Sequence, residues 1–267
     1  MRGFSRPDAY VSMRWGHGLR VDRVCLNDTP EFMRGLRLLF AADLHVRKSV
    51  TDSQLEDFFA LAEAQRADMV LLGGDFAEGE EQHARVFRML SRLKPPLGIY
   101  ACPGNNDRET FARHREFYRL AASSGIRLLE NRTCEAPYGG GRILVAGVDD
   151  HMYGAPNYRR LFPGNRQNTY RLLLSHYPVL PEDGCAPDCM LCGHTHGGQL
   201  NFCGVTPYTL GLVDRKQLPG GPVLAAGSAR IGQMRLLVSR GVGCSRMPLR
   251  VGVRPEIHLL ECTENLC

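Results

Sequence analysis

Short apolar runs alternate with amphipathic segments through the first half of the chain. The runs are typical of buried strands, and the segments between them carry apolar side chains at helical spacing. The pattern predicts strands at residues 36–44, 67–72 and 97–101. It also predicts one helix that begins at Thr51 or Asp52, and two more helices over residues 81–93 and 108–122. This βαβαβα order is typical of an α/β fold in which helices cover both faces of a sheet.

The second half of the chain is richer in predicted strands. They lie at residues 126–129, 142–148, 170–175, 189–192, 235–239 and 256–261. Two long connections, 153–168 and 201–233, are interrupted by Gly and Pro, and long loops in a compact domain are usually functional or mobile. We therefore expect a single domain over residues 35–267, preceded by an N-terminal arm over residues 1–34 that holds one strand near residues 21–26.

Composition excludes several classes of protein. The chain of 267 residues is 43% hydrophobic and 23% charged, values typical of a soluble globular protein rather than a disordered or fibrous one. No apolar run approaches the ~20 residues that span a bilayer. The first residues lack the apolar stretch of a signal peptide. We expect a cytoplasmic protein.

The net charge is +5, and all but three of the 33 basic residues are arginine. Arginine suits phosphate and carboxylate groups, so this balance fits an anionic substrate, although it also fits the average composition of a genome. The basic residues form no stripe, so we expect no nucleic-acid partner. Trp15 and the arginines near it in the arm indicate either a solvated arm or peripheral contact with the inner face of a membrane.

Cysteine spacing suggests one alternative chemistry. Cys185, Cys189 and Cys192 are spaced C-x3-C-x2-C, which is compatible with an iron–sulfur cluster. Cys192 also ends an apolar run, however, and free cysteine is among the most buried residue types. Buried thiols are therefore the competing interpretation.

Five short motifs with metal-binding side chains follow apolar runs. They are Asp43-Leu44-His45, Gly74-Asp75, Gly104-Asn105-Asn106-Asp107, Ser175-His176 and Gly193-His194-Thr195-His196-Gly197. Ligands of open α/β sheets bind at the carboxyl ends of the strands, so adjacent strands would bring these motifs to one crevice. Each motif alone is also compatible with a turn or a buried core histidine. The conjunction of five favours a shared site.

The residue types indicate metal chemistry. Asp-x-His and His-x-His put two side chains on one side of an extended chain, because strand side chains alternate. A carboxylate such as Asp75 has two oxygens and can bridge two ions. Oxygen donors mixed with imidazole, without thiolate, favour Mn²⁺, with Fe or Zn²⁺ as alternatives. Two ions ~3.5–4 Å apart are used to hydrolyse phosphate esters.

These motifs resemble the calcineurin-like metallophosphoesterase family, whose pattern runs D-x-H, G-D, G-N-H-D, H and G-H-x-H. The resemblance covers about residues 36–260. It implies a four-layer αββα sandwich, with two mixed β-sheets flanked by helices, and hydrolysis of a phosphate ester or pyrophosphate by a hydroxide between two divalent ions. The first ion would take Asp43, His45, His196 and the bridging Asp75, and the second would take Asp75, Asn105, His176 and His194.

A longer match, Gly193-His194-Thr195-His196-Gly197-Gly198-Gln199, resembles a bacterial branch that includes a UDP-2,3-diacylglucosamine hydrolase. The substrate would then be a phosphorylated small molecule or a lipid-linked one, such as a UDP-acylglucosamine. Arg159, Arg160 and Arg215 lie in the two long connections, and we expect them to bind additional phosphate groups.

One position departs from the family pattern. Asn106 stands where the family has a histidine that helps the leaving group depart, and an amide cannot supply a proton near neutral pH. Three interpretations follow: the substrate has a good leaving group or is a pyrophosphate, another histidine such as His151 replaces the missing one, or the chain is a weakly active or inactive relic that binds phosphorylated ligands.

Overall fold

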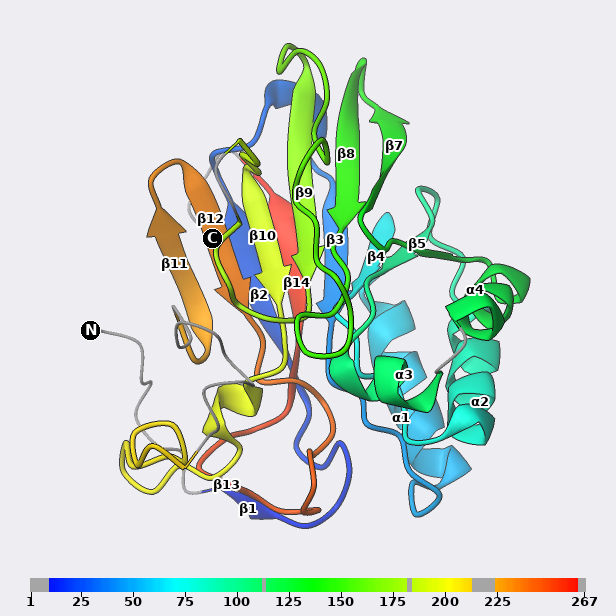
Figure 1. Cartoon of the computed structure of the whole chain (residues 1–267), viewed down its shortest axis with the longest axis vertical. Helices are drawn as coiled ribbons and strands as arrows, with labels where there is room; N and C mark the ends of the chain where they lie inside the picture. The colour runs from blue at the N-terminus through cyan, green and yellow to red at the C-terminus, as the bar shows by residue number, and fades with distance from the viewer. Residues whose placement is uncertain (1–9, 112–113, 182–183, 213–223, 264–267) are drawn as a thin grey trace.

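The computed structural model describes residues 10–111, 114–181, 184–212 and 224–263. Two six-stranded mixed sheets pack face to face (Figure 1). In strand order, the first sheet contains β2 (Arg20–Leu26), β14 (Glu256–Cys262), β3 (Arg37–Ala41), β4 (Met69–Leu72), β5 (Ile99–Ala101) and β6 (Ile126–Leu128). The second contains β11 (Gly227–Ile231), β12 (Met234–Val238), β10 (Cys189–Cys192), β9 (Thr169–Ser175), β8 (Gly141–Gly147) and β7 (Arg132–Tyr138).

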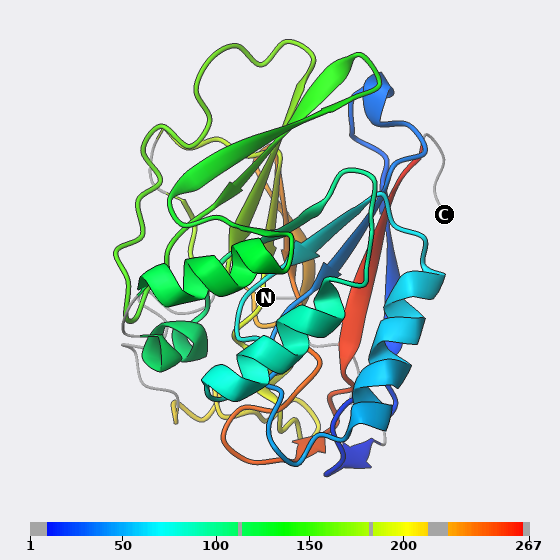
Figure 2. The ribbon, with the colours of Figure 1, turned by 90° about the vertical axis from the view of Figure 1, so that its right-hand side faces the viewer.

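Four α-helices lie on one side of the molecule. They are α1 (Asp52–Ala64), α2 (Glu80–Leu90), α3 (Asn105–Thr110) and α4 (His114–Ser123). Figures 1 and 2 show them together beside the first sheet. Helix α1 begins at a capping box, in which the Thr51 hydroxyl accepts from the Gln54 amide while the Gln54 side chain accepts from the Thr51 amide. Two short 3₁₀ helices, Glu31–Met33 and His196–Gly198, complete the helical elements of the described chain.

Alternating side chains divide the interior into layers. Along β3, Leu39 and Ala41 pack with the helices, whereas Leu38 and Phe40 pack between the two sheets. Because strand side chains alternate, one apolar run serves both cores. The inner sheet-to-sheet core therefore explains why the strands of the first sheet are apolar at consecutive positions.

The predicted pair of mixed sheets is confirmed, but the helical cover differs from the expectation. The helices pack on the outer face of the first sheet, and its inner face meets the second sheet instead of more helices. On the outer face of the second sheet, the core includes Tyr158 and Leu161 from the long connection 153–168. That connection has no helical periodicity, so a loop covers the face for which we expected helices.

Two elements differ from the predicted boundaries for local reasons. The segment predicted as one helix over residues 108–122 forms α3 and α4, because Phe111 has non-helical φ and ψ angles of −105° and 77°. Strands β7 and β11 were not predicted. Both lie at a sheet edge and are only partly buried, so they lack the apolar alternation that marks a strand in sequence.

Residues 10–34 of the predicted N-terminal arm are integrated into the fold. The strand predicted near residues 21–26 is confirmed as β2, which pairs in parallel with β14. Before it, β1 (Val11–Ser12) pairs with β13 (Arg250–Val251). The Trp15 indole packs edge-on against Phe58, with ring centroids 6.0 Å apart. Within the described residues, no helix is long and apolar enough to cross a bilayer.

Substitution at Leu172 tests the role of the inter-sheet core. This side chain is fully buried between the sheets, so Leu172→Ala should lower the free energy of unfolding by about 2–5 kcal/mol through lost contacts and a residual cavity. Leu180→Ala, at a position that is 41% exposed, should change it by less than about 0.5 kcal/mol. Urea denaturation measures both. Equal effects of the two substitutions would contradict the assigned packing.

Candidate metal centre

The predicted site residues follow five strands that end at the same edge of the two sheets. Asp43 and His45 follow β3, Asp75 follows β4, and Asn105 follows β5. From the second sheet, His176 follows β9, and both His194 and His196 follow β10. Strands β3, β4 and β5 are parallel neighbours, as are β9 and β10, so their carboxyl ends coincide. The structure brings all seven side chains into one cluster.

The backbone is strained where these side chains attach. Asp43, His45, Asp75, His194 and His196 all have positive φ, between 42° and 68°. Residues other than glycine rarely adopt this left-handed backbone conformation, and residues strained in this way cluster at functional sites. The backbone at Gly104 also passes so close to Asp75 that only glycine fits there, because a Cβ would lie 2.3 Å from the Asp75 carboxylate. The local backbone is therefore fitted around the carboxylates of Asp43 and Asp75.

One group of possible ligand atoms comes from Asp43, His45 and His196. These residues are buried, and their ligand atoms lie within 4.8 Å of one another. The His45 and His196 Nε2 atoms are 3.1 Å apart, and His196 Nε2 is 3.5 Å from Asp43 Oδ1. Two ring nitrogens facing each other so closely share at most one proton. A divalent cation placed among these lone pairs would satisfy them.

A second group, Asp43, Asp75 and His176, meets the same distance criterion. The Asn105 carbonyl oxygen adds a neutral donor, 3.2 Å from His176 Nε2 and 3.0 Å from His194 Nδ1. Asp75 Oδ2 lies between the two groups, 3.3 Å from His45 Nε2 and 3.4 Å from His176 Nε2. This carboxylate oxygen therefore lies within 3.4 Å of a histidine of each group.

Burial sets the electrostatics of the cluster. It raises the pKa of Asp43, because a charged carboxylate loses its hydration there. Burial also raises the pKa of Asp75, but the attraction and hydrogen bond of His176 outweigh it and leave that pKa lowered. The pKa of His196 is well below its ordinary value, owing first to burial and then to His45. Burial lowers the pKa of His176, but the charge of Asp75 outweighs it and raises that pKa to about 10, so a cation bound here would take the place of the His176 proton.

Asp107 anchors the loops that carry these side chains. Its fully buried carboxylate accepts hydrogen bonds from the backbone amides of Gly104, Asp75 and Phe76 at 2.8, 2.8 and 3.0 Å, and it contacts His83 Nε2 at 2.8 Å. It therefore joins the loop after β4 to the loop after β5. Sequence reasoning missed the role of His83. Its position on the buried face of α2 is a signal for packing but not for this hydrogen bond.

Asn106 faces the cluster. Its backbone amide donates to Asp75 Oδ1 at 2.8 Å, and its side-chain amide donates to Asp75 Oδ2 at 2.7 Å. Both carboxylate oxygens of Asp75 are thus held by one residue. The contact to Oδ1 comes from the backbone and would persist in a histidine, whereas the contact to Oδ2 comes from the Asn106 side chain.

His151 is directed elsewhere. Its Nε2 lies 2.8 Å from the Tyr158 hydroxyl, and its ring packs against Tyr177 with centroids 5.3 Å apart. Burial, and next the nearby His176, lower the pKa of His151 to about 4. It is therefore neutral near pH 7 and engaged with the loop that covers the second sheet. The geometry does not support His151 as the replacement proton donor.

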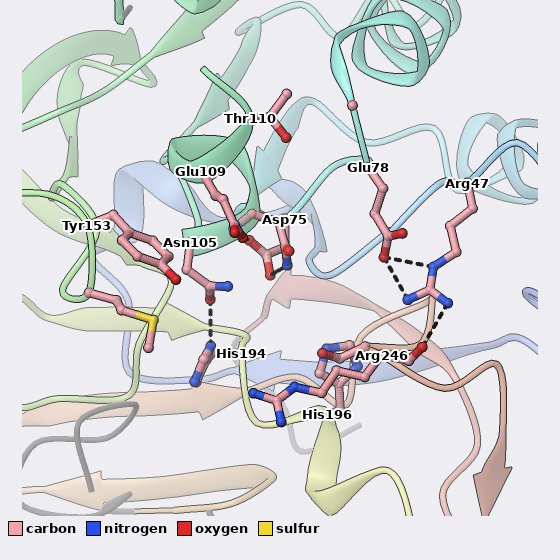
Figure 3. A pocket seen from close by; sticks show the side chains of 14 residues that line it. Arg47, Asp75, Glu78, Asn105, Glu109, Thr110, Tyr153, His194, His196 and Arg246 are labelled. Atoms are coloured by element: carbon pink, nitrogen blue, oxygen red, sulfur yellow. Dashed lines mark hydrogen bonds and ion pairs between the residues drawn. The ribbon is translucent and has the colours of Figure 1, made fainter. Parts of the chain in front are cut away.

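A polar cavity of about 530 Å³ opens onto the cluster. Figure 3 shows Asp75, Asn105, His194 and His196 at its base. Arg47 and Arg246 supply positive charge at the wall, and sequence reasoning missed both. Arg47 also contacts Glu78, with its Nη2 atom 2.6 Å from Glu78 Oε1.

The arginines predicted to bind substrate are not part of this cavity. Arg159 and Arg160 are exposed and do not line it, because the connection that carries them runs over the second sheet. Arg215 lies outside the described residues. From the long connections, only Tyr153, together with Met152 just before it, lines the cavity within the described part of the chain.

The iron–sulfur alternative is wrong in its geometry. Cys189 packs between the two sheets, whereas Cys192 packs on the outer face of the second sheet. Their side chains leave β10 in opposite directions, so they cannot bind one cluster. No cysteine belongs to a possible metal-binding group in the part of the chain that the structure describes.

Comparison with known proteins agrees with the geometry. The family model described as calcineurin-like phosphoesterase matches residues 36–198. The chain belongs to this family. Protein YpbG of Bacillus subtilis is 30% identical over 84% of this chain and 80% of its own length. Phosphodiesterase YaeI of Escherichia coli is 31% identical over 84% of this chain and 81% of its own length.

Among solved structures, phosphopantetheinyl hydrolase from Mycobacterium tuberculosis aligns with a TM-score of 0.47 and 13% identity, over 81% of this chain and 95% of that one. The family assignment rests on the sequence match and not on this structural likeness. As a member of a family of phosphoesterases, the chain is a phosphoester hydrolase with candidate metal-binding residues.

Asp107→Asn tests the anchoring carboxylate. The substitution keeps the size but removes the charge and turns an amide group toward a donor, so it should lower the free energy of unfolding by about 2–4 kcal/mol. Asp57→Asn, at an exposed position of α1, is the matched control and should have little effect. Urea denaturation of the metal-free protein separates this structural role from metal binding. A stability equal to that of the control would exclude the anchoring role.

Proposed function

We propose that this chain hydrolyses a phosphate ester or pyrophosphate at a centre of two divalent ions. The first ion is held by Asp43, His45, His196 and Asp75, and the second by Asp75, Asn105, His176 and His194. The observation that carries the proposal is the place of Asp75 Oδ2, 3.3 Å from a histidine of one set and 3.4 Å from a histidine of the other. A shared carboxylate is what a dinuclear site requires.

The donors fit the ions proposed. Two carboxylates, one amide oxygen and four imidazoles converge without a thiolate, which favours Mn²⁺, with Fe or Zn²⁺ as alternatives. When bound, two such ions lower the pKa of a water molecule and neutralise charge on the phosphoryl group. The protein supplies the rest: fixed ligands and a polar cavity whose wall includes Arg47 and Arg246.

The residues of the chain orient these groups before substrate arrives. Asn106 holds both oxygens of Asp75, so the bridging carboxylate has one orientation. The backbone amide of His194 contacts both oxygens of Asp43 at 3.0 Å. Hydrogen bonds of this kind keep metal ligands in place and are costly to remove.

Asn106 also limits the reaction. It can donate a hydrogen bond to a departing oxygen but no proton, and general acid catalysis is typically worth ~10²–10⁴-fold. Substrates with good leaving groups, such as aryl or nucleoside phosphates and pyrophosphates, are therefore favoured over alkyl esters. The similarity to YaeI of Escherichia coli, a phosphodiesterase, supports a diester. An inactive relic is not favoured, because all seven candidate ligand side chains are present and converge.

The finer substrate assignment rests on the resemblance to the branch with the Gly-His-Thr-His-Gly-Gly-Gln motif. On that basis we propose that the substrate is a phosphorylated small molecule or a lipid-linked molecule of the UDP-acylglucosamine type. In the structure, Arg47 and Arg246 rather than Arg159 or Arg160 lie at the cavity wall, which Glu78 and Glu109 also line, so the wall carries charges of both signs.

Removing the bridging charge tests the dinuclear centre. With added Mn²⁺, the wild-type chain should hydrolyse bis(p-nitrophenyl) phosphate, and Asp75→Asn should lower kcat/KM by at least about 10²-fold, since one neutral oxygen cannot serve two ions. Calorimetry with Mn²⁺ should show fewer bound ions in the variant. Asp57→Asn is the control. Full activity of Asp75→Asn, or turnover without divalent metal, would contradict the proposal.

The leaving-group argument is tested by restoring the family residue. Asn106→His should raise kcat/KM for an alkyl phosphate ester by about 10-fold more than for an aryl ester, because only the alkoxide needs a proton. Rates of both esters are measured over a range of pH. A similar gain on the two esters, or none on either, would remove the argument.

A further inference from the structure

A second cavity, of about 320 Å³, lies next to the candidate metal centre. His45 lines it, and Arg47 lines both this cavity and the larger one. The two cavities are therefore adjacent across one residue. Volumes near 300 Å³ are within the range of small-ligand sites. The second cavity contains none of the other candidate metal ligands, so it has no evident role in holding the ions.

Half of the ten residues that line this cavity are apolar. Met13 and Trp15 come from the N-terminal segment, Val50 precedes α1, and Pro248 comes from the segment before β13. Positive charge accompanies them, because Arg14 lines the same space as Arg47. Hydrocarbon beside guanidinium groups suits a molecule that is apolar at one end and anionic at the other.

Trp15 is held rigidly against the metal centre. Its indole N–H donates to the Leu44 carbonyl at 2.6 Å, and its own carbonyl accepts from the Gln54 side chain at 3.2 Å. Leu44 immediately precedes the candidate ligand His45. The indole is thus fixed both to the loop after β3 and to α1. A fixed aromatic wall loses little conformational entropy when a ligand packs against it.

Apolar side chains close in sequence to the lining of the cavity are exposed. Met13, which lines it, is 71% exposed. Val11, two residues before Met13, is 68% exposed, and Met247, next to the lining residue Pro248, is 52% exposed. Val11 pairs with Val251, so the N-terminal segment and the segment that follows Pro248 are joined by β1 and β13, which Figure 1 shows together at one end of the molecule. Grouped, exposed apolar side chains are typical of a binding site.

We propose that the second cavity binds the hydrocarbon portion of an amphipathic phosphodiester whose phosphate lies at the metal centre. Arg47 marks the junction between the two portions, and Trp15 and Met13 receive the alkyl or acyl chain. This inference rests on the proposed function and extends it by naming the substrate class. It also assigns the N-terminal segment to substrate binding.

Chain length in the substrate tests the proposal. With Mn²⁺, kcat/KM for octyl p-nitrophenyl phosphate should exceed that for methyl p-nitrophenyl phosphate by about 10²-fold, because each methylene that leaves water favours binding by up to about fourfold. Met13→Asp places a charge at the rim of the cavity and should reduce this ratio at least 10-fold. Leu212→Asp, an equally exposed position that does not line the cavity, should leave the ratio unchanged.

A second measurement does not depend on turnover. Trp15 is the single tryptophan of the chain, and it lines both this cavity and a neighbouring one of about 400 Å³. Its fluorescence therefore reports on this part of the molecule, and Met13, which lines only the proposed cavity of the two, distinguishes between them. Octylphosphonate should cause a saturable change in emission that methylphosphonate does not cause, and Met13→Asp should weaken the response at least 10-fold in apparent Kd. Leu212→Asp should respond as the wild type does.

The outcomes separate the two proposals. A Trp15 response without hydrolysis of either ester would retain the cavity and overturn the catalytic proposal. Hydrolysis of both esters at equal kcat/KM, with no change in Trp15 emission, would overturn the cavity and retain the catalytic proposal. A chain-length preference that Met13→Asp and Leu212→Asp alter equally would also overturn it, because the preference would then arise elsewhere on the surface.

Discussion

The structure depends on the burial of two carboxylates, Asp43 and Asp75, among imidazole rings. Water is excluded from both, and their mutual repulsion is opposed by His176 and by amide donors from Asn106 and His194. Carboxylates are rarely buried unless they are paired or bind a metal. The left-handed backbone at five of the seven candidate ligand residues adds to the cost of this arrangement. Such a site persists only because the surrounding structure determines it fully, and the Asp107 carboxylate provides much of that support.

Much of the fold and of the centre could be predicted because the signals are local. Apolar runs marked β3, β4, β5, β9 and β10, and the candidate ligands follow their ends. The D-x-H and H-x-H spacings identified pairs of side chains without knowledge of the fold. Local signals in the sequence cannot predict which residue a side chain contacts in a distant part of the chain. Nothing near Trp15 in the sequence indicates that its indole contacts the Leu44 carbonyl, 29 residues away.

The incorrect expectations have physical causes. Arg159 and Arg160 lie in a connection whose Tyr158 and Leu161 side chains cover the second sheet, and both arginines are exposed and do not line the cavity at the site. Edge strands β7 and β11 are stabilised by backbone pairing on one side and bury few side chains. His151 was chosen for its residue type, but its position is set by Tyr158 and Tyr177. In each case tertiary packing set the position of the residue or strand, and residue type or local pattern alone could not predict that position.

The candidate ligands are divided between the two sheets. Asp43, His45, Asp75 and Asn105 belong to the first, whereas His176, His194 and His196 belong to the second. Any ion held by both sets cross-links the halves of the sandwich, in addition to the hydrophobic contacts between them. Metal occupancy would then contribute to the rigidity of the whole domain, and the relative sliding of the sheets would change the separation of the ions. In the proposed centre, catalytic competence and mechanical integrity would be coupled through the same few side chains.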